Sequence, residues 1–249
     1  MKSIHALLAL TLVASALPAM AADEAPAAPA AAPDPLSFNV SVTSDYRYRG
    51  ISQTRLKPAL QGGIDYAFDS GFYVGTWAST INWIKDVGGD TDVEVDFYGG
   101  YKTEVAKGLT LDVGALQYYY NSNKLNPSAN TFELYGALSF GPVTAKYSHA
   151  LTNTFANPDS KNSGYFDVSA SFEVVDGWTL APHVGHQTIK GPVGSVASYS
   201  DYSLTLSKAF GGFTPSIAVI GTDADKGFYT VKDKFLGKTS FVVALKYAF

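Results

Sequence analysis

The sequence of 249 residues has no cysteine, and this absence excludes several kinds of site at once. Without thiols the chain can form neither a disulfide bond nor a thiolate metal site. It also lacks the cysteine to which a secreted lipoprotein attaches its lipid. Basic residues are scarce as well, because 18 Lys and Arg stand against 22 Asp and Glu, for a net charge of −4. Binding to nucleic acid is therefore not expected, since it needs a basic surface.

Long apolar runs are missing too. The run at 6–17 is too short for a membrane-spanning helix, which needs about 20 residues. It follows Lys2 and precedes a small-x-small motif at 19–21, the pattern of a cleaved secretory signal. We expect a signal peptide at 1–21 that directs export through the inner membrane of a Gram-negative bacterium. Residues 22–35, ADEAPAAPAAAPDP, predict an extended Pro/Ala-rich periplasmic linker.

From residue 36 onward, apolar and polar side chains alternate. In residues 36–49, LSFNVSVTSDYRYR, the even positions are apolar except Ser44, and the odd positions are all polar. This period of two predicts a strand with two different faces. Its length suits a tilted membrane strand, which needs about 9–11 residues, better than a globular strand of about 5–6. The same alternation recurs at 93–102, 131–140, 165–174, 178–187 and 240–249.

The connections between these segments alternate in length. Tight turns rich in Gly and Asp are expected at 69–71, 106–108, 141–142, 176–177 and 211–212. Long polar loops are expected at 50–57, 84–91, 121–130, 153–163, 188–198 and 222–237. These connections join twelve strands, with short periplasmic turns and long extracellular loops. Because only closed barrels satisfy strand backbones in hydrocarbon, we predict an all-β fold, a 12-stranded antiparallel transmembrane β-barrel of the outer-membrane type over 36–249.

The alternation is unclear in two places. Residues 72–83 fit neither parity well, and the apolar face changes sides near Ala115–Leu116, which indicates a β-bulge. Aromatic residues near the strand ends predict girdles at the two membrane interfaces. These aromatic residues are Tyr46, Tyr48, Trp77, Trp83, Tyr118, Tyr119, Tyr120, Tyr165, Trp178 and Tyr247.

Residues 41–79 resemble the opening block of the TorF family of proposed porins, a proteobacterial outer-membrane β-barrel family. The resemblance rests on TSDYRYRGISQT, PALQGGIDY and SGFYVGTWAS, together with EVDFYGGYK at 94–102 and the closing KYAF. It implies an outer-membrane barrel with a pore role, and it brings no substrate and no catalytic residues. The last strand also resembles the C-terminal signal that outer-membrane proteins present to the barrel assembly machinery. The residues expected to carry this signal are Phe241, Val243, Leu245, Tyr247 and Phe249.

Inward-facing ionisable residues would set the preference of a pore. Carboxylates at 92, 94 and 96 share one strand face, about 6.6–6.8 Å apart, and would form an acidic wall. Because the last strand closes on the first, Arg47, Arg49 and Lys246 could form a basic wall and give a transverse field. The alternative is that these groups pair and fill the interior. The pore-lining candidates are Asp45, Arg47, Arg49, Asp65, Asp92, Glu94, Asp96, Lys102, Asp112, Glu133, Lys146, His183 and Lys246.

The function expected from these features is passive passage of small hydrophilic solutes or ions, with weak cation preference. Expected partners are outer-membrane lipid and lipopolysaccharide, the assembly machinery and the solutes themselves. No cofactor follows, and GGDTD at 88–92 and DADKG at 223–227 are only fragments of calcium loops. One alternative is a non-conducting or gated barrel that acts as a scaffold or receptor. A hydrolase of the phospholipase type is another, although Ser148, Ser169 and Ser171 lie in no nucleophile motif.

Overall fold

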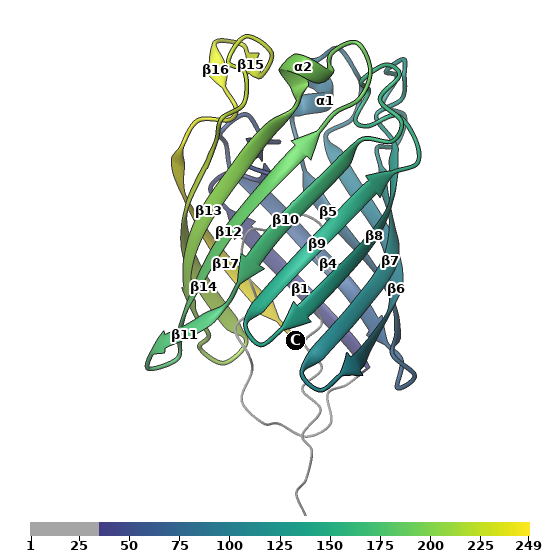
Figure 1. The fold of residues 1–249 in the computed structure, drawn as a ribbon. Coiled ribbons are helices and arrows are strands. Elements are labelled where there is room, and N and C mark those ends of the chain that lie inside the picture. The colour runs from purple at the N-terminus through teal and green to yellow at the C-terminus, as the bar shows by residue number, and fades with distance from the viewer. Residues whose placement is uncertain (1–34) are drawn as a thin grey trace, which may run out of the picture.

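A computed structural model describes residues 35–249 of the chain. The expected signal peptide and nearly all of the expected linker lie outside these residues. Twelve long strands close into an antiparallel barrel (Figure 1). They are β1 (Leu36–Thr43), β4 (Ala59–Ala67), β5 (Phe72–Thr80), β6 (Val93–Ala106), β7 (Leu109–Tyr119), β8 (Thr131–Phe140), β9 (Val143–Ala150), β10 (Gly164–Ala170), β12 (Trp178–Thr188), β13 (Tyr199–Lys208), β14 (Phe213–Thr222) and β17 (Ser240–Ala248).

The ring closes between the first and last long strands. β17 pairs with β1 from Asn39↔Ala248 to Thr43↔Ala244, and its other edge pairs with β14. On the far side of the ring, β10 joins β9 to β12. A short strand, β11 (Phe172–Val175), continues β10 beyond Ser171 and pairs with the same β12. The prediction of a 12-stranded antiparallel barrel is confirmed.

Short turns and long loops lie at opposite ends of the barrel (Figure 1). Each tight turn contains a glycine with a left-handed φ, between 55° and 91°, which lets the hairpin reverse in few residues. These glycines are Gly71, Gly108, Gly141, Gly177 and Gly211. The long loops at the other end carry α1 (Trp83–Asp86), α2 (Gly194–Ala197), β15 (Thr230–Val231) and β16 (Lys234–Phe235). Within residues 35–249, neither helix has the length and hydropathy to cross a membrane.

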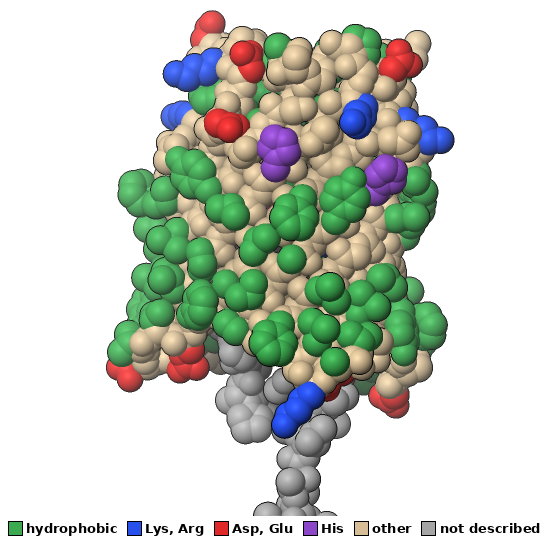
Figure 2. Space-filling view, in the orientation of Figure 1, with side chains coloured by type: hydrophobic (Ala, Val, Ile, Leu, Met, Phe, Trp, Pro, Cys, Tyr) green, Lys and Arg blue, Asp and Glu red, His purple; other side chains and the backbone are tan. Residues whose placement is uncertain are grey.

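The outer face of the barrel wall is apolar. Hydrophobic side chains are spread over the visible wall, whereas Lys, Arg, Asp and Glu gather toward its two ends (Figure 2). On β17, Phe241 is 74% exposed and Val243 is 52% exposed, while Val242 between them is buried. The buried inward positions of other strands are mostly polar, as at Ser41, Gln61 and Thr205. A lipid-facing exterior and a polar interior are the pattern of an outer-membrane barrel.

The first predicted strand ends earlier than expected. β1 stops at Thr43, so the prediction of one strand over 36–49 is wrong for its last six residues. Beyond it, residues 44–57, here called the lumen segment, turn into the barrel and form a small hairpin of β2 (Arg47–Tyr48) and β3 (Ile51–Ser52). Alternation could not reveal this, because a hairpin packed inside a barrel has the same period as a wall strand.

The two uncertain stretches have regular geometry. β7 keeps continuous register with both neighbours through Ala115 and Leu116, so the bulge expected there is absent. The irregularity between β6 and β7 lies instead between Glu104 and Ala106. Leu116 is a buried residue on the inward face, which is why the apolar face seemed to change sides. In β5, Trp77 likewise is buried on the inward face and obscures the parity.

Most of the expected girdle aromatics lie inside the barrel. Buried members of that set are Tyr46, Tyr48, Trp77, Tyr118, Tyr120 and Tyr165. The girdle interpretation is therefore wrong for these six. Tyr119 and Tyr247 are exposed and remain consistent with an interfacial position.

A charge placed on the outer wall tests this assignment of faces. Leu245→Arg would put a cation against lipid, and we expect the free energy of unfolding to fall by about 2–4 kcal/mol. Ser216→Arg, on the inward face of neighbouring β14, should lower it far less, because Ser216 is only partly buried. Urea unfolding of both variants in phospholipid vesicles measures the difference. Equal losses would contradict the assigned orientation of β14 and β17.

Candidate functional site

The lumen segment crosses the interior of the barrel. It is tied to the wall at its start, where the Ser44 amide donates to the carbonyl of Val243. Further along, the Ser52 amide donates to Leu236, and the carbonyl of Gln53 accepts from Asn82. Residues 45–52 are all buried. The segment therefore fills the extracellular half of the lumen instead of standing above it.

Arg49, at the tip of the hairpin, reaches the opposite wall. Its two terminal nitrogens donate to the two carboxylate oxygens of Glu133 at 3.1 and 2.7 Å, and one of them also donates to Gln187. The guanidinium carbon lies 4.7 Å from the ring centroid of Tyr48 and 4.3 Å from that of Tyr165. A forked ion pair between two aromatic rings is both directional and shielded from water. It joins the segment to β8, β10 and β12, far around the ring from β1.

Arg47 is held within the segment and by a neighbouring loop. Its Nε lies 2.5 Å from an oxygen of Asp45, and its Nη1 donates to the carbonyls of Gly50, Leu236 and Lys238. The other oxygen of Asp45 accepts from hydroxyls of the same segment. The expected basic wall of Arg47, Arg49 and Lys246 is therefore not formed, because both arginines leave the first strand and pair with carboxylates.

Tyrosines surround Glu94 under the lumen segment. The hydroxyls of Tyr46 and Tyr120 donate to its two oxygens at 2.6 and 2.5 Å. Tyr46 also packs edge-to-face on Trp77, with centroids 5.4 Å apart. Glu94 is 2% exposed, so these contacts leave no room for water beside its carboxylate.

Asp96, two residues further on the same strand, has a different environment. It is 0% exposed, and neither of its oxygens accepts a hydrogen bond from any residue within 35–249. A buried carboxylate without donors is costly, because nothing replaces the water that it has lost. Asp96 is thus the least satisfied group under the lumen segment.

Toward the periplasmic turns the inward side chains keep partial contact with solvent. Asp112 accepts from Tyr73 at 2.6 Å, Asp65 accepts from Tyr98, and the Lys146 ammonium lies 4.2 Å from the centroid of Tyr135. Residues here that are only partly buried are Asp65, Lys102, Lys146 and Lys246. At the middle of β12, His183 stands between two carboxylates, with Nε2 3.1 Å from Asp201 and Nδ1 3.9 Å from Asp167. The periplasmic half of the lumen is therefore more accessible to solvent than the half beneath the extracellular loops.

Asp92 does not belong with Glu94 and Asp96. It precedes β6 in an extracellular loop, its side chain is 62% exposed, and it accepts from Lys85 at 2.8 Å. That hydrogen bond lowers the pKa of Asp92 below its ordinary value. The expected acidic wall thus keeps only two of its three carboxylates inside the barrel.

Four lumen tyrosines pack over glycines of neighbouring strands. Tyr98 covers Gly75, Tyr73 covers Gly100, Tyr135 covers Gly114 and Tyr165 covers Gly185, and a Cβ at any of these glycines would collide with the ring above it. The candidates chosen from the sequence omitted these tyrosines, as well as Gln187 and Asp201. Counting inward parity along each strand would have found them, because they occupy the same face as His183 and Glu133.

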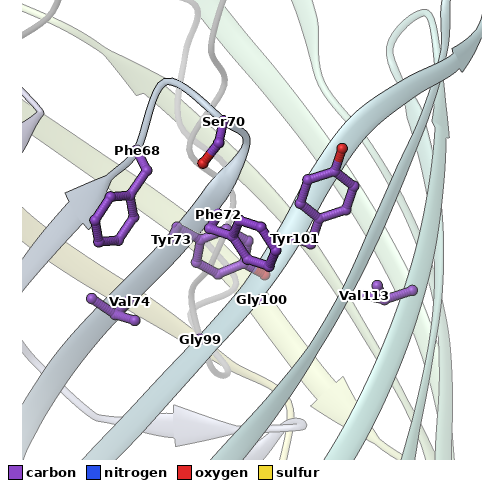
Figure 3. Close-up of a pocket in the computed structure, with 9 residues that line it drawn as sticks. All are labelled: Phe68, Ser70, Phe72, Tyr73, Val74, Gly99, Gly100, Tyr101 and Val113. Carbon is purple, nitrogen blue, oxygen red and sulfur yellow. The ribbon is translucent and has the colours of Figure 1, made fainter.

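The described residues show two further features. No group of three or more His, Asp or Glu within 35–249 is arranged to hold a metal ion. An apolar hollow lies on the outer wall where Gly99 leaves a gap among Phe72, Val74 and Tyr101, beside the first tight turn (Figure 3). Because this hollow opens on the lipid-facing side, it is not part of the lumen.

Comparison with known proteins places the chain in a family and a fold. It belongs to the family described as "Bacterial protein of unknown function (Gcw_chp)", which matches residues 27–249. The likeness of residues 41–79 to the TorF family remains a resemblance in sequence. No curated protein sequence matches the chain.

Three solved structures are similar to the barrel. The KdgM porin is 10% identical, with 86% of this chain and 98% of that chain covered and a TM-score of 0.54. The NanC porin is 11% identical, with 85% and 98% covered and a TM-score of 0.53. The COG4313 outer membrane channel from Pseudomonas putida F1 is 14% identical, with 88% and 96% covered and a TM-score of 0.51. At these identities the likeness shows a shared outer-membrane porin fold.

Glu94 provides a test of the packing under the lumen segment. Glu94→Leu would leave the hydroxyls of Tyr46 and Tyr120 without their acceptor, and we expect a loss of about 1–3 kcal/mol of stability for each. Glu94→Gln keeps one acceptor oxygen and should cost clearly less. The free energies come from urea unfolding in vesicles. If Glu94→Leu were as stable as the unchanged protein, this tyrosine–carboxylate contact would not hold the extracellular half together.

Proposed function

We propose that this protein is an outer-membrane channel for passive passage of small hydrophilic solutes or ions, and that the lumen segment controls access to it. The observation that carries the proposal is the polar inner face of a closed barrel. A barrel needed only as a scaffold could fill its interior with apolar side chains. Here the inward face bears carboxylates, lysines and hydroxyls from strand to strand. Similarity in fold to two porins and an outer-membrane channel supports the same reading.

The charges along the lumen favour cations. Buried and partly buried inward positions of the twelve long strands carry seven carboxylates, against three lysines and one histidine, and the lumen segment adds Asp45, Arg47 and Arg49. The acidic group consists of Asp65, Glu94, Asp96, Asp112, Glu133, Asp167 and Asp201, and the basic group of Lys102, Lys146 and Lys246. Rings of like charge on a pore wall select for ions of opposite charge. We propose a weak preference for cations, tempered by the lysines among the acids.

The proposal also covers how the chain is exported and inserted into the outer membrane. We propose export by a cleaved signal peptide at 1–21, and insertion with β17 as the assembly signal. Phe241, Val243, Leu245, Tyr247 and Phe249 are all outward and exposed, so they are accessible to an assembly partner before lipid covers them. Lipid and lipopolysaccharide would then contact the apolar outer wall. No catalytic role is proposed for His183, whose Nε2 already contacts Asp201 and Tyr165.

Reversal potentials test the proposed selectivity. The refolded protein in a planar bilayer should show discrete conductance steps and a cation-favouring reversal potential under a salt gradient. The double variant Asp65→Asn and Asp112→Asn should move that potential toward zero. Asp92→Asn is the matched control, since Asp92 lies outside the lumen, and it should leave the potential unchanged. A cation preference lost only with Asp92→Asn would place selectivity in the loops and contradict the proposal.

A further inference from the structure

We infer that the lumen segment is a two-state gate, with Arg49 as the latch that holds it closed and Asp96 as the group that favours its release. The inference rests on the proposed channel function and concerns how that channel is regulated. It follows from three properties of residues 44–57 and of the wall behind them. These are the ion pair that joins its tip to the far wall, the polar groups that it covers, and one buried carboxylate without a donor.

The segment is attached to neighbouring loops by backbone hydrogen bonds and to the far wall by side chains at its tip. In the ring of strands it lies between β1 and β4, so its two ends remain fixed while its middle crosses the lumen. Across that lumen, the tip contacts the far wall through the fork from Arg49 to Glu133, extended to Gln187, while the Tyr48 hydroxyl donates to Tyr118. Arg49 and Gly50 have left-handed φ values of 46° and 79°. The backbone turns there, and Gly50 packs closely against β13 and β14. The Arg49 fork is the charged contact of the tip with the far wall, so its loss weakens the closed position more than the loss of a neutral hydrogen bond would.

The surfaces that part on opening combine polar and aromatic side chains. Behind the segment the wall presents the buried polar residues Glu94, Glu133, Gln187 and Asp201, together with the rings of Trp77 and Tyr118. The segment itself, SDYRYRGISQTRLK, contains few aliphatic residues and would be soluble as an extracellular loop. A permanent core would bury apolar side chains on both surfaces, because exposing them would cost free energy. The polar groups on both surfaces lower the cost of opening, whereas the aromatic contacts of Tyr46 and Tyr48 stabilise the closed state.

Asp96 opposes closure. In the closed barrel it is fully buried without a donor, on the same face as Glu94 and near the Glu133 carboxylate. The tyrosines close enough to interact with its charge are Tyr46, Tyr98, Tyr118 and Tyr120, and none of them donates to it. Withdrawal of the segment would hydrate this carboxylate and relieve the cost of its burial. The structure thus contains a latch and an opposing charge on the two sides of one moving segment.

Once the segment withdraws, Arg47 and Arg49 leave the lumen together with Asp45, the partner of Arg47. Arg49 then no longer offsets Glu133 and its acidic neighbours on the wall. The open channel is therefore more selective for cations than the charge of the closed barrel suggests. Small cationic solutes are the class that this passage would favour.

Opposite effects from two single substitutions test the gate. Arg49→Gln removes the fork to Glu133 and should raise the open fraction of single channels about tenfold or more. Asp96→Asn replaces the buried charge by a less costly amide and should lower the open fraction about tenfold. Lys57→Gln removes a charge from the exposed end of the same segment and should change little. Heat-modifiable mobility on gels shows that each variant is folded before recording.

A reversible crosslink gives a second measurement. The chain has no cysteine, so Arg49→Cys with Gln187→Cys can be bridged by a bifunctional methanethiosulfonate. The double cysteine variant lacks the Arg49–Glu133 ion pair, and bridging its two cysteines should abolish its current. Reductant should restore the current. The single Arg49→Cys variant should not lose its current with the same reagent.

The outcomes separate the two proposals. If Arg49→Gln and Asp96→Asn both conduct like the unchanged protein, or if bridging leaves the current intact, the gate is wrong and the channel stands. If folded protein is silent in every variant, including Arg49→Gln, both the channel and its gate are wrong. An open fraction that rises with Arg49→Gln and falls with Asp96→Asn supports both.

Discussion

The rest of the structure depends on one constraint, which is that a strand in hydrocarbon must find partners for every backbone amide and carbonyl. β17 meets it by pairing with both β14 and β1, so the ladder has no free edge. Closure fixes which side chains point inward along all twelve strands, since neighbouring residues face opposite sides. The polarity of the lumen and the apolar outer wall are consequences of that single ring of hydrogen bonds.

Closure also explains how much of the fold could be predicted from the sequence. Strand number, turn positions and the inward parity of residues such as Glu133 and His183 follow from period two and from Gly-rich turns. The path of residues 44–57 does not follow, because Tyr46 and Tyr48 alternate with Asp45 and Arg47 as they would in a wall strand. Their inward turn depends on a contact between Arg49 and Glu133, 84 residues apart, which no local pattern encodes.

The candidate site was predictable in composition but not in arrangement. Parity placed Glu94 and Asp96 on one face, and the structure has them there. It could not distinguish Glu94, which receives two tyrosine hydroxyls, from Asp96, which receives none. It also grouped Asp92 with them, since only the start of β6 at Val93 separates a lumen residue from a loop residue. Differences of this kind arise from packing between distant strands.

The lumen segment occupies space that the width of a 12-stranded barrel leaves inside it. Eight-stranded barrels are narrow enough for wall side chains to fill, and barrels of 16 or more strands leave a wide channel. Twelve strands leave a wider interior than eight, and tyrosines pack directly over Gly75, Gly100 and Gly114 on its wall. A folded hairpin with two tyrosines and two arginines occupies the remaining space in the extracellular half. Each arginine finds a carboxylate there, and the two tyrosines pack on Trp77 and Tyr118, so the hairpin completes the interior with both charged and aromatic contacts.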